Sequence, residues 1–255
     1  MLLTLLKFLK NTLLIVPFWG MSGFLLSQDL NIKTEQLKNK KVKIAYDTKI
    51  GSIRGEIEKL RVDTNNFEVL IRAFKIEKEL DIWLRNHKDE KFVLYKSFPI
   101  CETSGRPGPK RREGDLQVPE GIYEIKSFNE NSKYHLSMLI SYPNKSDKIK
   151  GKKPLGGAIM IHGKCKTIGC MPMTDEIMES IYIICLESYS FGHPIRVESY
   201  PCRMDSTRVN AMMKKYGGKH KRLWTQLNKS YSYFEEKKIP VNFKIDNRGN
   251  YIFNP

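Results

Sequence analysis

The chain has 255 residues, of which 40% are hydrophobic and 28% are charged. This composition predicts one well-buried domain with additions, and five cysteines are too few for a disulfide-rich scaffold. The 44 Lys and Arg outnumber the 28 Asp and Glu and give a formal net charge of +16. This excess indicates an acidic partner: nucleic acid, an anionic membrane face, or a polymer rich in carboxylates or phosphates.

The first residues have the layout of an export segment. Lys7 and Lys10 precede an uncharged stretch, 11–28, in the order of the n-region and h-region of a signal peptide. Residues 1–28 are either a cleaved signal peptide or an uncleaved anchor, although Pro17 breaks the span and it is slightly short for a membrane helix. Both alternatives predict export to the periplasm or cell envelope. An exported basic chain rarely meets nucleic acid, so we expect no nucleic-acid partner.

Residues 29–66 are predicted to form a basic linker and one helix. The helix is indicated by apolar residues at helical spacing, namely Ile50, Ile53, Ile57 and Leu60. Further on, short runs rich in Val, Ile, Phe and Tyr predict strands. These strands cover residues 67–76, 79–84, 91–100, 122–128, 134–140 and 156–162. A Gly-, Pro- and charge-rich stretch, 101–121, interrupts them as a long loop, and such loops usually carry function.

The second half of the chain is predicted to be richer in helices. Thr174 is a suitable N-cap for a helix that runs to residue 189, with Asp175 and Glu176 in its first turn. After it we predict a strand, two helices and a closing strand pair, at residues 194–200, 205–216, 221–237, 241–245 and 251–253. The fold class is therefore α+β. A β-rich domain with a mixed sheet or sandwich covers residues 67–202, and a helical extension covers residues 203–255.

The stretch IHGKCKTIGC, residues 161–170, combines a histidine and two cysteines. One interpretation is a metal site with His162, Cys165 and Cys170 as ligands, although structural zinc sites normally show a second ligand pair. Another is a disulfide between Cys165 and Cys170. The third is a thiol nucleophile, Cys170, with His162 as its base.

The third interpretation requires that the pKa of the thiol be lowered, because the thiolate is the attacking species. Cys170 lies four residues before the predicted cap Thr174, and a helix N-terminus favours negative charge. His162 ends the preceding strand. The sequence therefore predicts a lowered pKa for Cys170, and the flanking glycines permit backbone N–H groups to approach a substrate carbonyl.

Several blocks around these residues are typical of one family. They are FVLYKSFPICETSG, EGDLQVPEGIY, YHLSMLISYPN, IHGKCKTIGCMPMTD and SYSYFEE, in this order. Through them, residues 67–255 resemble the L,D-transpeptidase (YkuD-domain) family, and in particular its YafK-like branch. In this family an apolar strand ends in His-Gly, and a later Ser-His-Gly-Cys carries the nucleophile. The resemblance implies a YkuD-like catalytic domain over residues 67–202.

The resemblance also implies roles for individual residues. Cys170 is implied to be the nucleophile, His162 the general base, and the Gly163 carbonyl the group that orients the imidazole. The backbone N–H groups of Gly169 and Cys170 are implied to face the developing oxyanion. Candidate substrate-binding residues are Arg106, Arg111, Tyr134, His135 and Thr167. No metal and no cofactor is expected.

The bland alternatives for these binding residues are a solvated basic loop and, for His135, a hydrogen-bonded core histidine. Of the other cysteines, Cys101 and Cys165 fall inside family-like blocks, and the sequence leaves their pairing open. Two departures from the family pattern bear on the activity. Ile168 replaces the usual His of Ser-His-Gly-Cys, and Pro172 replaces an Arg that helps to hold a substrate carboxylate.

The function implied is a peptidoglycan-modifying cysteine enzyme. It forms a thioester with the diaminopimelate carbonyl of a stem peptide and passes it to an amine, as a transpeptidase, or to water. The first alternative is an L,D-carboxypeptidase or an amidohydrolase that releases a wall-linked lipoprotein. An alternative from another class is a non-catalytic, basic module that binds the cell wall. The expected partners are stem peptides, a wall-linked lipoprotein, and the inner-membrane surface if residues 11–28 stay uncleaved.

Overall fold

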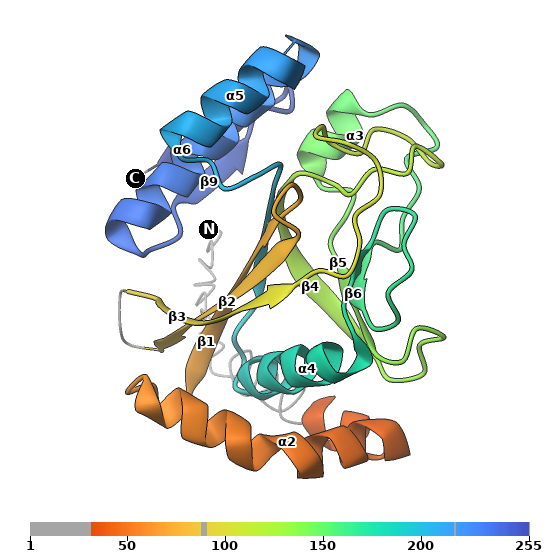
Figure 1. Cartoon of the computed structure of the whole chain (residues 1–255), viewed down its shortest axis with the longest axis vertical. Coiled ribbons are helices and arrows are strands. Elements are labelled where there is room, and N and C mark those ends of the chain that lie inside the picture. Colours follow the sequence, from red (N-terminus) through yellow and green to blue (C-terminus); the bar gives the residue numbers. More distant parts are fainter. Residues whose placement is uncertain (1–31, 88–90, 217, 255) are drawn as a thin grey trace, which may run out of the picture.

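The computed structural model describes residues 32–87, 91–216 and 218–254 (Figure 1). The predicted export segment, residues 1–28, lies outside this part of the chain. In the ranges described, no helix combines the length and the apolar character that crossing a bilayer requires.

The centre of the molecule is one mixed sheet of eight strands, in the order β3-β2-β1-β8-β4-β5-β6-β7. The strands are β1 (Phe67–Phe74), β2 (Glu79–Asn86), β3 (Val93–Pro99), β4 (Gly121–Asn129), β5 (Ser137–Ile140), β6 (Met160–His162), β7 (Met171–Pro172) and β8 (Arg196–Tyr200). The pairs β1–β8 and β6–β7 are parallel, and the other pairs are antiparallel. The predicted α+β class with a mixed sheet is confirmed. The strands form a single sheet rather than a sandwich.

Strands β5 and β6 begin three and four residues later than the sequence pattern predicts. β5 begins only at Ser137, because His135 has a φ of 68°, and β6 begins only at Met160, because Ala158 has a φ of 52°. Left-handed backbone of this kind cannot continue a strand. The elements that were not predicted include the short strand β7, the six-residue helix α3 (Lys145–Lys150) and the 3-10 helix η1 (Gly218–His220). They are too short to give a periodic pattern.

Two helices cover one end of the sheet (Figure 1). Helix α4 (Asp175–Ser190) starts at the predicted N-cap, where the Thr174 side chain accepts from the Ile177 N–H. It buries an apolar face on the sheet, and α2 (Lys40–Lys59) packs against it through Val42, Ala45, Ile53 and Ile57. Residues 32–37 are also helical. The helix predicted around Ile53 is therefore present, and it is packed on the domain.

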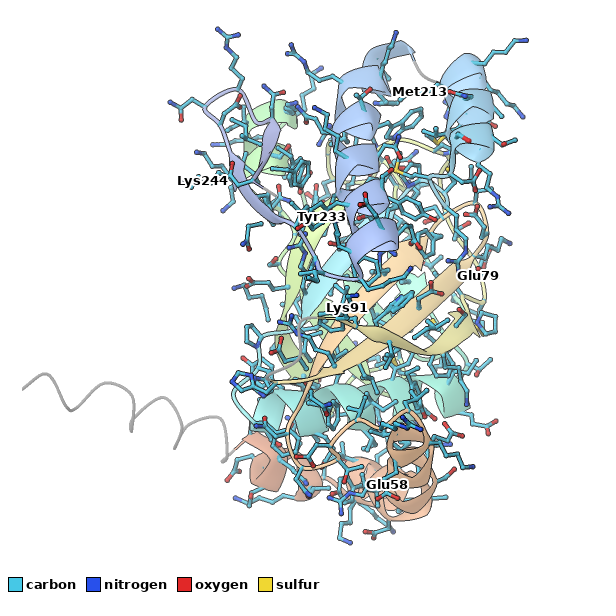
Figure 2. The ribbon with its side chains drawn as sticks, turned by 90° about the vertical axis from the view of Figure 1, so that its left-hand side faces the viewer. Glu58, Glu79, Lys91, Met213, Tyr233 and Lys244 are labelled. Carbon is cyan, nitrogen blue, oxygen red and sulfur yellow. A yellow bond between two sulfur atoms is a disulfide. The ribbon has the colours of Figure 1, made fainter. Side chains whose placement is uncertain are left out.

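The C-terminal residues pack at the opposite end of the sheet. They form α5 (Ser206–Tyr216), the short 3-10 helix η1 (Gly218–His220), α6 (Lys221–Lys237) and a two-stranded sheet of β9 (Asn242–Ile245) and β10 (Tyr251–Asn254). Figure 2 shows Met213 on α5 and Tyr233 on α6 at this end, with Glu58 of α2 at the other. A second apolar cluster joins this extension to the sheet through Phe74, Tyr200 and Trp224.

Candidate active site

Backbone pairing brings His162 and Cys170 to neighbouring strands at the edge of the sheet. His162 ends β6, and Cys170 immediately precedes β7, the last strand in the sheet order. The parallel register places Ile161 beside Met171 and His162 beside Pro172. The Met160 N–H of β6 donates to Cys170 Sγ at 3.4 Å. The thiol thus lies against the strand that carries the imidazole, two residues before it.

The His162 imidazole is held in one orientation. Its Nδ1 lies 2.6 Å from the Gly163 carbonyl oxygen, and the side chain is nearly inaccessible, with 2% of the residue exposed. A carbonyl only accepts hydrogen bonds, so Nδ1 carries the proton and Nε2 keeps its lone pair. Burial lowers the pKa of His162 below its ordinary value, and the bond to Gly163 opposes this in part. The imidazole is therefore neutral at pH 7, with Nε2 able to accept a proton.

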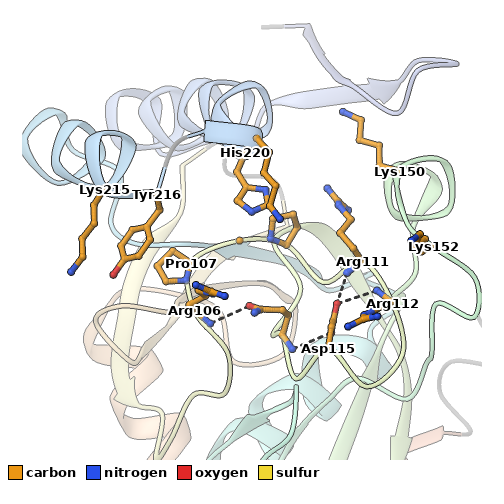
Figure 3. Close-up of a pocket in the computed structure, with 14 residues that line it drawn as sticks. Arg106, Pro107, Arg111, Arg112, Asp115, Lys150, Lys152, Lys215, Tyr216 and His220 are labelled. Atoms are coloured by element: carbon orange, nitrogen blue, oxygen red, sulfur yellow. Dashed lines mark hydrogen bonds between the residues drawn. The ribbon is translucent and has the colours of Figure 1, made fainter.

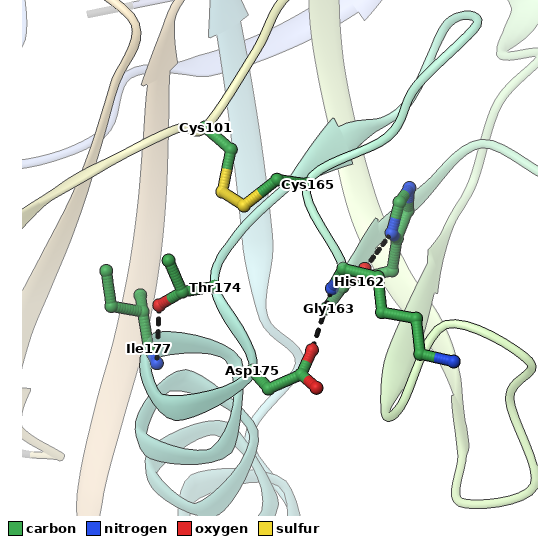
Figure 4. Close-up of a disulfide and its surroundings, with 8 residues drawn as sticks. Cys101, His162, Gly163, Cys165, Thr174, Asp175 and Ile177 are labelled. Atoms are coloured by element: carbon green, nitrogen blue, oxygen red, sulfur yellow. Dashed lines mark hydrogen bonds between the residues drawn. A yellow bond between two sulfur atoms is a disulfide. The ribbon is translucent and has the colours of Figure 1, made fainter.

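Gly163 occupies a position that has no room for a side chain. A Cβ there would lie 2.6 Å from Asp175 Oδ1, 2.9 Å from His135 Cβ and 2.9 Å from the Tyr134 carbonyl oxygen. The Asp175 carboxylate also accepts from the Lys164 N–H at 2.8 Å (Figure 4). The absence of a side chain lets the start of α4 and the turn before β5 approach the residue next to His162.

The prediction that the pKa of Cys170 is lowered is wrong. Burial raises the pKa of this thiol, and the Met160 N–H and the Lys110 charge oppose the shift only in part. Helix α4 starts five residues later, and its first turn carries the acids Asp175 and Glu176, which offset the positive helix end. The resting pair is therefore a neutral thiol and a neutral imidazole, rather than a thiolate beside a cation.

Thr167 closes the loop before the thiol. Its Oγ1 accepts from the N–H groups of Gly169 and Cys170, at 3.2 and 2.8 Å, and its hydroxyl donates to the Cys170 carbonyl at 3.0 Å. The two N–H groups that the resemblance assigned to an oxyanion hole thus point at Thr167 in this structure. Gly169 has a φ of 140°, and a Cβ there would lie 3.2 Å from the Gln117 carbonyl oxygen.

A disulfide ties this loop to the start of the long loop (Figure 4). Cys101 and Cys165 are bonded, with their Cα atoms 5.2 Å apart, and the Cys101 N–H donates to the Pro172 carbonyl at 2.9 Å. Because Cys165 is committed to Cys101, both a Cys165–Cys170 disulfide and a metal site that uses Cys165 are excluded. The free thiols in the described residues are those of Cys170, Cys185 and Cys202, of which only Cys170 is not fully buried.

Of the other candidate substrate-binding residues, one lies at the site and three lie away from it. Tyr134 lies over the site, since its ring centroid is 4.7 Å from that of His162. His135 turns away from the site, because its Nε2 is 2.9 Å from Glu179 Oε1 on α4. Arg106 and Arg111 line a pocket of about 680 Å³, whose lining includes neither His162 nor Cys170 (Figure 3).

A buried ion pair that the sequence did not suggest fixes the long loop. The Lys75 ammonium donates to the carbonyls of Arg106, Gly108 and Val118 at 3.2, 2.8 and 2.9 Å, and to Glu120 Oε1 at 3.0 Å. Glu120 also accepts from the Gly108 N–H. It accepts from Trp224 of α6 as well, at 2.7 Å. The hint in the sequence is that Lys75 lies near the end of a largely apolar run, FEVLIRAFKI.

Metal-binding side chains gather only away from this site, in the ranges that the structure covers. Glu68, His87 and His193 have ligand atoms within 4.8 Å of one another. However, the Arg85 guanidinium donates to Glu68 Oε2 at 2.6 and 3.0 Å, and its positive charge opposes a cation there. We therefore assign no metal site.

Comparison with known proteins matches the chain to one family. Residues 78–197 match the family model of YkuD, the L,D-transpeptidase catalytic domain. YafK of Escherichia coli (strain K12), which carries the name of an L,D-transpeptidase, is 36% identical over 187 residues, covering 72% of this chain and 73% of YafK. The same values hold for YafK of Escherichia coli O157:H7.

Two solved structures are more distant. The helical cell shape determining protein Pgp2 from Campylobacter jejuni is 19% identical, with a TM-score of 0.45, covering 72% of this chain and 74% of Pgp2. Bdellovibrio bacteriovorus Bd1075 is 17% identical, with a TM-score of 0.39, covering 67% of this chain and 61% of that protein.

Proposed function

Because this chain belongs to the L,D-transpeptidase (YkuD-domain) family, in its YafK-like branch, we propose that it is a peptidoglycan enzyme with Cys170 as its nucleophile. The observation that carries the proposal is the arrangement at the sheet edge. Cys170 Sγ lies against the backbone of β6, and the same strand ends in an imidazole whose Nδ1 is fixed by the Gly163 carbonyl. We place the activity in the periplasm, where this family acts on the cell wall.

The proposed reaction begins with attack by Cys170, whose thiol proton passes to His162 Nε2 in the same step. The sulfur attacks the diaminopimelate carbonyl of a stem peptide, and His162 then gives the proton to the departing amine, which leaves a thioester on Cys170. Water or a second amine next attacks the thioester, His162 takes its proton, and the thiol is restored. Because burial keeps the resting pair neutral, proton transfer accompanies attack rather than preceding it.

The oxyanion of each tetrahedral intermediate needs hydrogen-bond donors. The N–H groups of Gly169 and Cys170 now donate to Thr167 Oγ1, so the oxyanion would take the place of this hydroxyl. Rotation of the Thr167 side chain would free both donors while leaving the backbone in place. Tyr134, which lies beside His162 and is 46% exposed, is positioned to contact the bound stem.

Hydrolysis is the second candidate outcome, and Pro172 favours it. The family's usual residue at this position is an arginine that helps to hold a substrate carboxylate, and Pro172 has no charge to offer. With one carboxylate contact fewer at this place, water competes better with a second stem as the acceptor. The hydrolytic reaction would be either that of a carboxypeptidase or the release of a wall-linked lipoprotein.

The test is incubation of intact sacculi with the wild-type protein and with Cys170→Ala, read by mass spectrometry of the muropeptides. New dimers that depend on Cys170 indicate transfer, and shortened or freed stems indicate hydrolysis. Cys202→Ala removes a buried thiol elsewhere and is the matched control, which we expect to behave as wild type. If Cys170→Ala and wild type leave the same muropeptides, the enzyme proposal fails and a wall-binding module takes its place.

A further inference from the structure

The pocket that contains Arg106 and Arg111 is built by three separate segments (Figure 3). The long loop forms one wall, residues at the end of α3 and just after it form the second, and residues of α5 and η1 form the third. Its volume of about 680 Å³ falls within the range of about 300–1,000 Å³ that is typical of small-ligand sites. This is far more room than one inorganic anion needs.

The lining of this pocket is strongly cationic. It contains seven basic side chains, those of Arg106, Arg111, Arg112, Lys150, Lys152, Lys215 and Lys219. Asp115 is the single acid of the lining, and its carboxylate is already used by the Lys110 ammonium and by the N–H groups of Arg111, Arg112 and Gln117.

Most of these cations lack an acidic partner. Of the seven, only Arg111 forms a salt bridge within the described chain, with Asp147 at 3.1 Å. Lys150 donates to the Asn250 amide oxygen, which carries no charge. Like charges therefore face one cavity without neutralisation, an arrangement that costs free energy unless an anion enters.

Burial lowers the pKa of two titratable groups in the lining, and positive charges nearby lower both further. Burial lowers the pKa of Lys150, and the charges of Arg111 and Arg222 lower it further. Burial also lowers the pKa of His220, and although Glu120 opposes the shift, Lys219 and Arg111 add to it. Both shifts are in the direction that an excess of cations produces.

The pocket adjoins the loop that carries the nucleophile. Gln117 is part of its lining, and the Gln117 carbonyl oxygen lies 3.2 Å from the position that a Gly169 Cβ would take. Gly169 precedes Cys170. The charge of Lys110, which lies in the same long loop, also acts on the pKa of the Cys170 thiol. The lining of the pocket thus lies next to the nucleophile loop at Gln117.

We infer that this pocket binds free carboxylates of the stem peptide whose carbonyl reacts with Cys170, and that the C-terminal extension supplies one of its walls through Lys215 and Lys219. Guanidinium groups bind carboxylates in a bidentate manner, and lysines add diffuse attraction. The inference rests on the proposed function. The pocket would recognise the substrate's negative charge, which the uncharged side chain of Pro172 cannot do.

The test measures equilibrium binding to Cys170→Ala protein, in which no turnover occurs. The probe is a stem tripeptide that ends in diaminopimelate with free carboxylates, and the comparison is the same peptide with its carboxylates amidated. We expect Lys215→Ala/Lys219→Ala to weaken binding of the free peptide about tenfold, equivalent to about 1.4 kcal/mol, and amidation to do the same. Both lysines are exposed, so the unfolding midpoint should not change.

The matched control is Lys221→Ala/Lys229→Ala, which removes the same charge from α6 outside this pocket. Equal weakening by the two double variants, or equal binding of the amidated peptide, overturns the inference. It is also overturned if pyrophosphate binds with dependence on Lys215 and Lys219 while the peptide does not.

The outcomes for the pocket and for the proposed function can be told apart. Lysine-dependent binding with no reaction on sacculi refutes only the role of Cys170, whereas reaction with an unchanged KM in the lysine variant refutes only the pocket.

Discussion

The Lys75 ammonium lies 3.0 Å from the Glu120 carboxylate, and both side chains are buried between the sheet and the C-terminal extension. Lys75 follows β1 directly, and Glu120 directly precedes β4. Together they bind three loop carbonyls, one loop N–H group and the indole of Trp224. This pair therefore connects the sheet, the cationic loop and α6, and it sets the position of the loop that adjoins Gly169.

Lys75→Met should destabilise the protein by about 3–5 kcal/mol, because it leaves the Glu120 charge buried without its partner. Urea unfolding measures the loss. Lys126→Met makes the same change at an exposed lysine of β4 and should alter the free energy of unfolding by less than about 0.5 kcal/mol. Equal losses in the two variants would show that the Lys75–Glu120 pair does not hold the loop.

The reaction of Cys170 with iodoacetamide should have the pH dependence of a neutral thiol. Burial raises the pKa of Cys170 above its ordinary value of 9.0, so the alkylation rate should rise steadily with pH through the neutral range. Subtraction of the rate of Cys170→Ala removes any reaction at the two buried thiols. A plateau below pH 6.5, typical of a thiolate paired with an imidazolium, would contradict the neutral resting pair.

The pH profile of kcat/KM should lose activity on the acid side as His162 becomes protonated. Burial lowers the pKa of His162 below its ordinary value of 6.5, so the acid limb should have its midpoint below pH 6.5. Measurement across pH 4 to 8 on a soluble stem peptide tests this. A midpoint above 6.5 would mean that a carboxylate or the substrate itself holds a proton on the imidazole.

Loss of the Cys101–Cys165 disulfide should lower stability and activity together. The bond joins residues that are 64 positions apart in the sequence. A disulfide that closes such a loop is expected to add about 2–4 kcal/mol to the free energy of unfolding. Because Cys165 lies between His162 and Cys170, its release also loosens the segment that joins base and nucleophile. Cys101→Ser/Cys165→Ser should show a lower unfolding midpoint and a lower kcat, and dithiothreitol should affect wild type but leave this variant unchanged. An equal effect of dithiothreitol on both would assign the loss to another cause.

Most of the regular elements could be predicted because their signals are local. β1 and β2 are apolar runs joined by a tight turn, and α4 has both a capping residue, Thr174, and acids in its first turn. The apolar run before His162 also predicted a strand that ends at this residue, as β6 does. By contrast, α3 and β7 were missed because six and two residues are too few to show a period.

The electrostatics of the site could not be predicted from local sequence. Spacing suggested that a helix end would ionise Cys170, but burial of the thiol raises its pKa, and the Met160 N–H opposes this shift only in part. Lys75 and Glu120 are 45 residues apart, and nothing in the local sequence marks them as partners. The cationic pocket combines residues from the long loop with Lys215 and Lys219, about 100 residues later. Only the fold brings these groups together.

Arg111 stabilises the buried carboxylate of Asp147 in addition to lining the pocket. Burial raises the pKa of Asp147 to about 6, and Arg111, 3.1 Å away, opposes the shift. Without Arg111 the folded-state pKa should rise further above the ordinary value of 3.8, so the folded protein would gain stability from proton uptake at low pH and lose it as pH rises. Arg111→Ala should therefore cost roughly 1–3 kcal/mol more at pH 8 than at pH 5. Arg106→Ala, which removes a guanidinium without a salt bridge in the described chain, should show no such difference in urea unfolding.

Gly163→Ala should abolish most activity, because an added Cβ would collide with Asp175 and with the Tyr134 carbonyl. Relief of these contacts requires the backbone to move, and the Gly163 carbonyl that fixes His162 Nδ1 moves with it. Overpacking of this kind costs about 1–3 kcal/mol of stability. Activity should be assayed well below the unfolding midpoint, where the variant is folded, and kcat should fall more than tenfold while KM changes little. Gly157→Ala adds a methyl group where nothing lies within 4 Å, and it should keep wild-type kcat. If Gly163→Ala loses stability but keeps kcat, the carbonyl does not position the imidazole, and the hydrogen bond between the two residues has only a structural role.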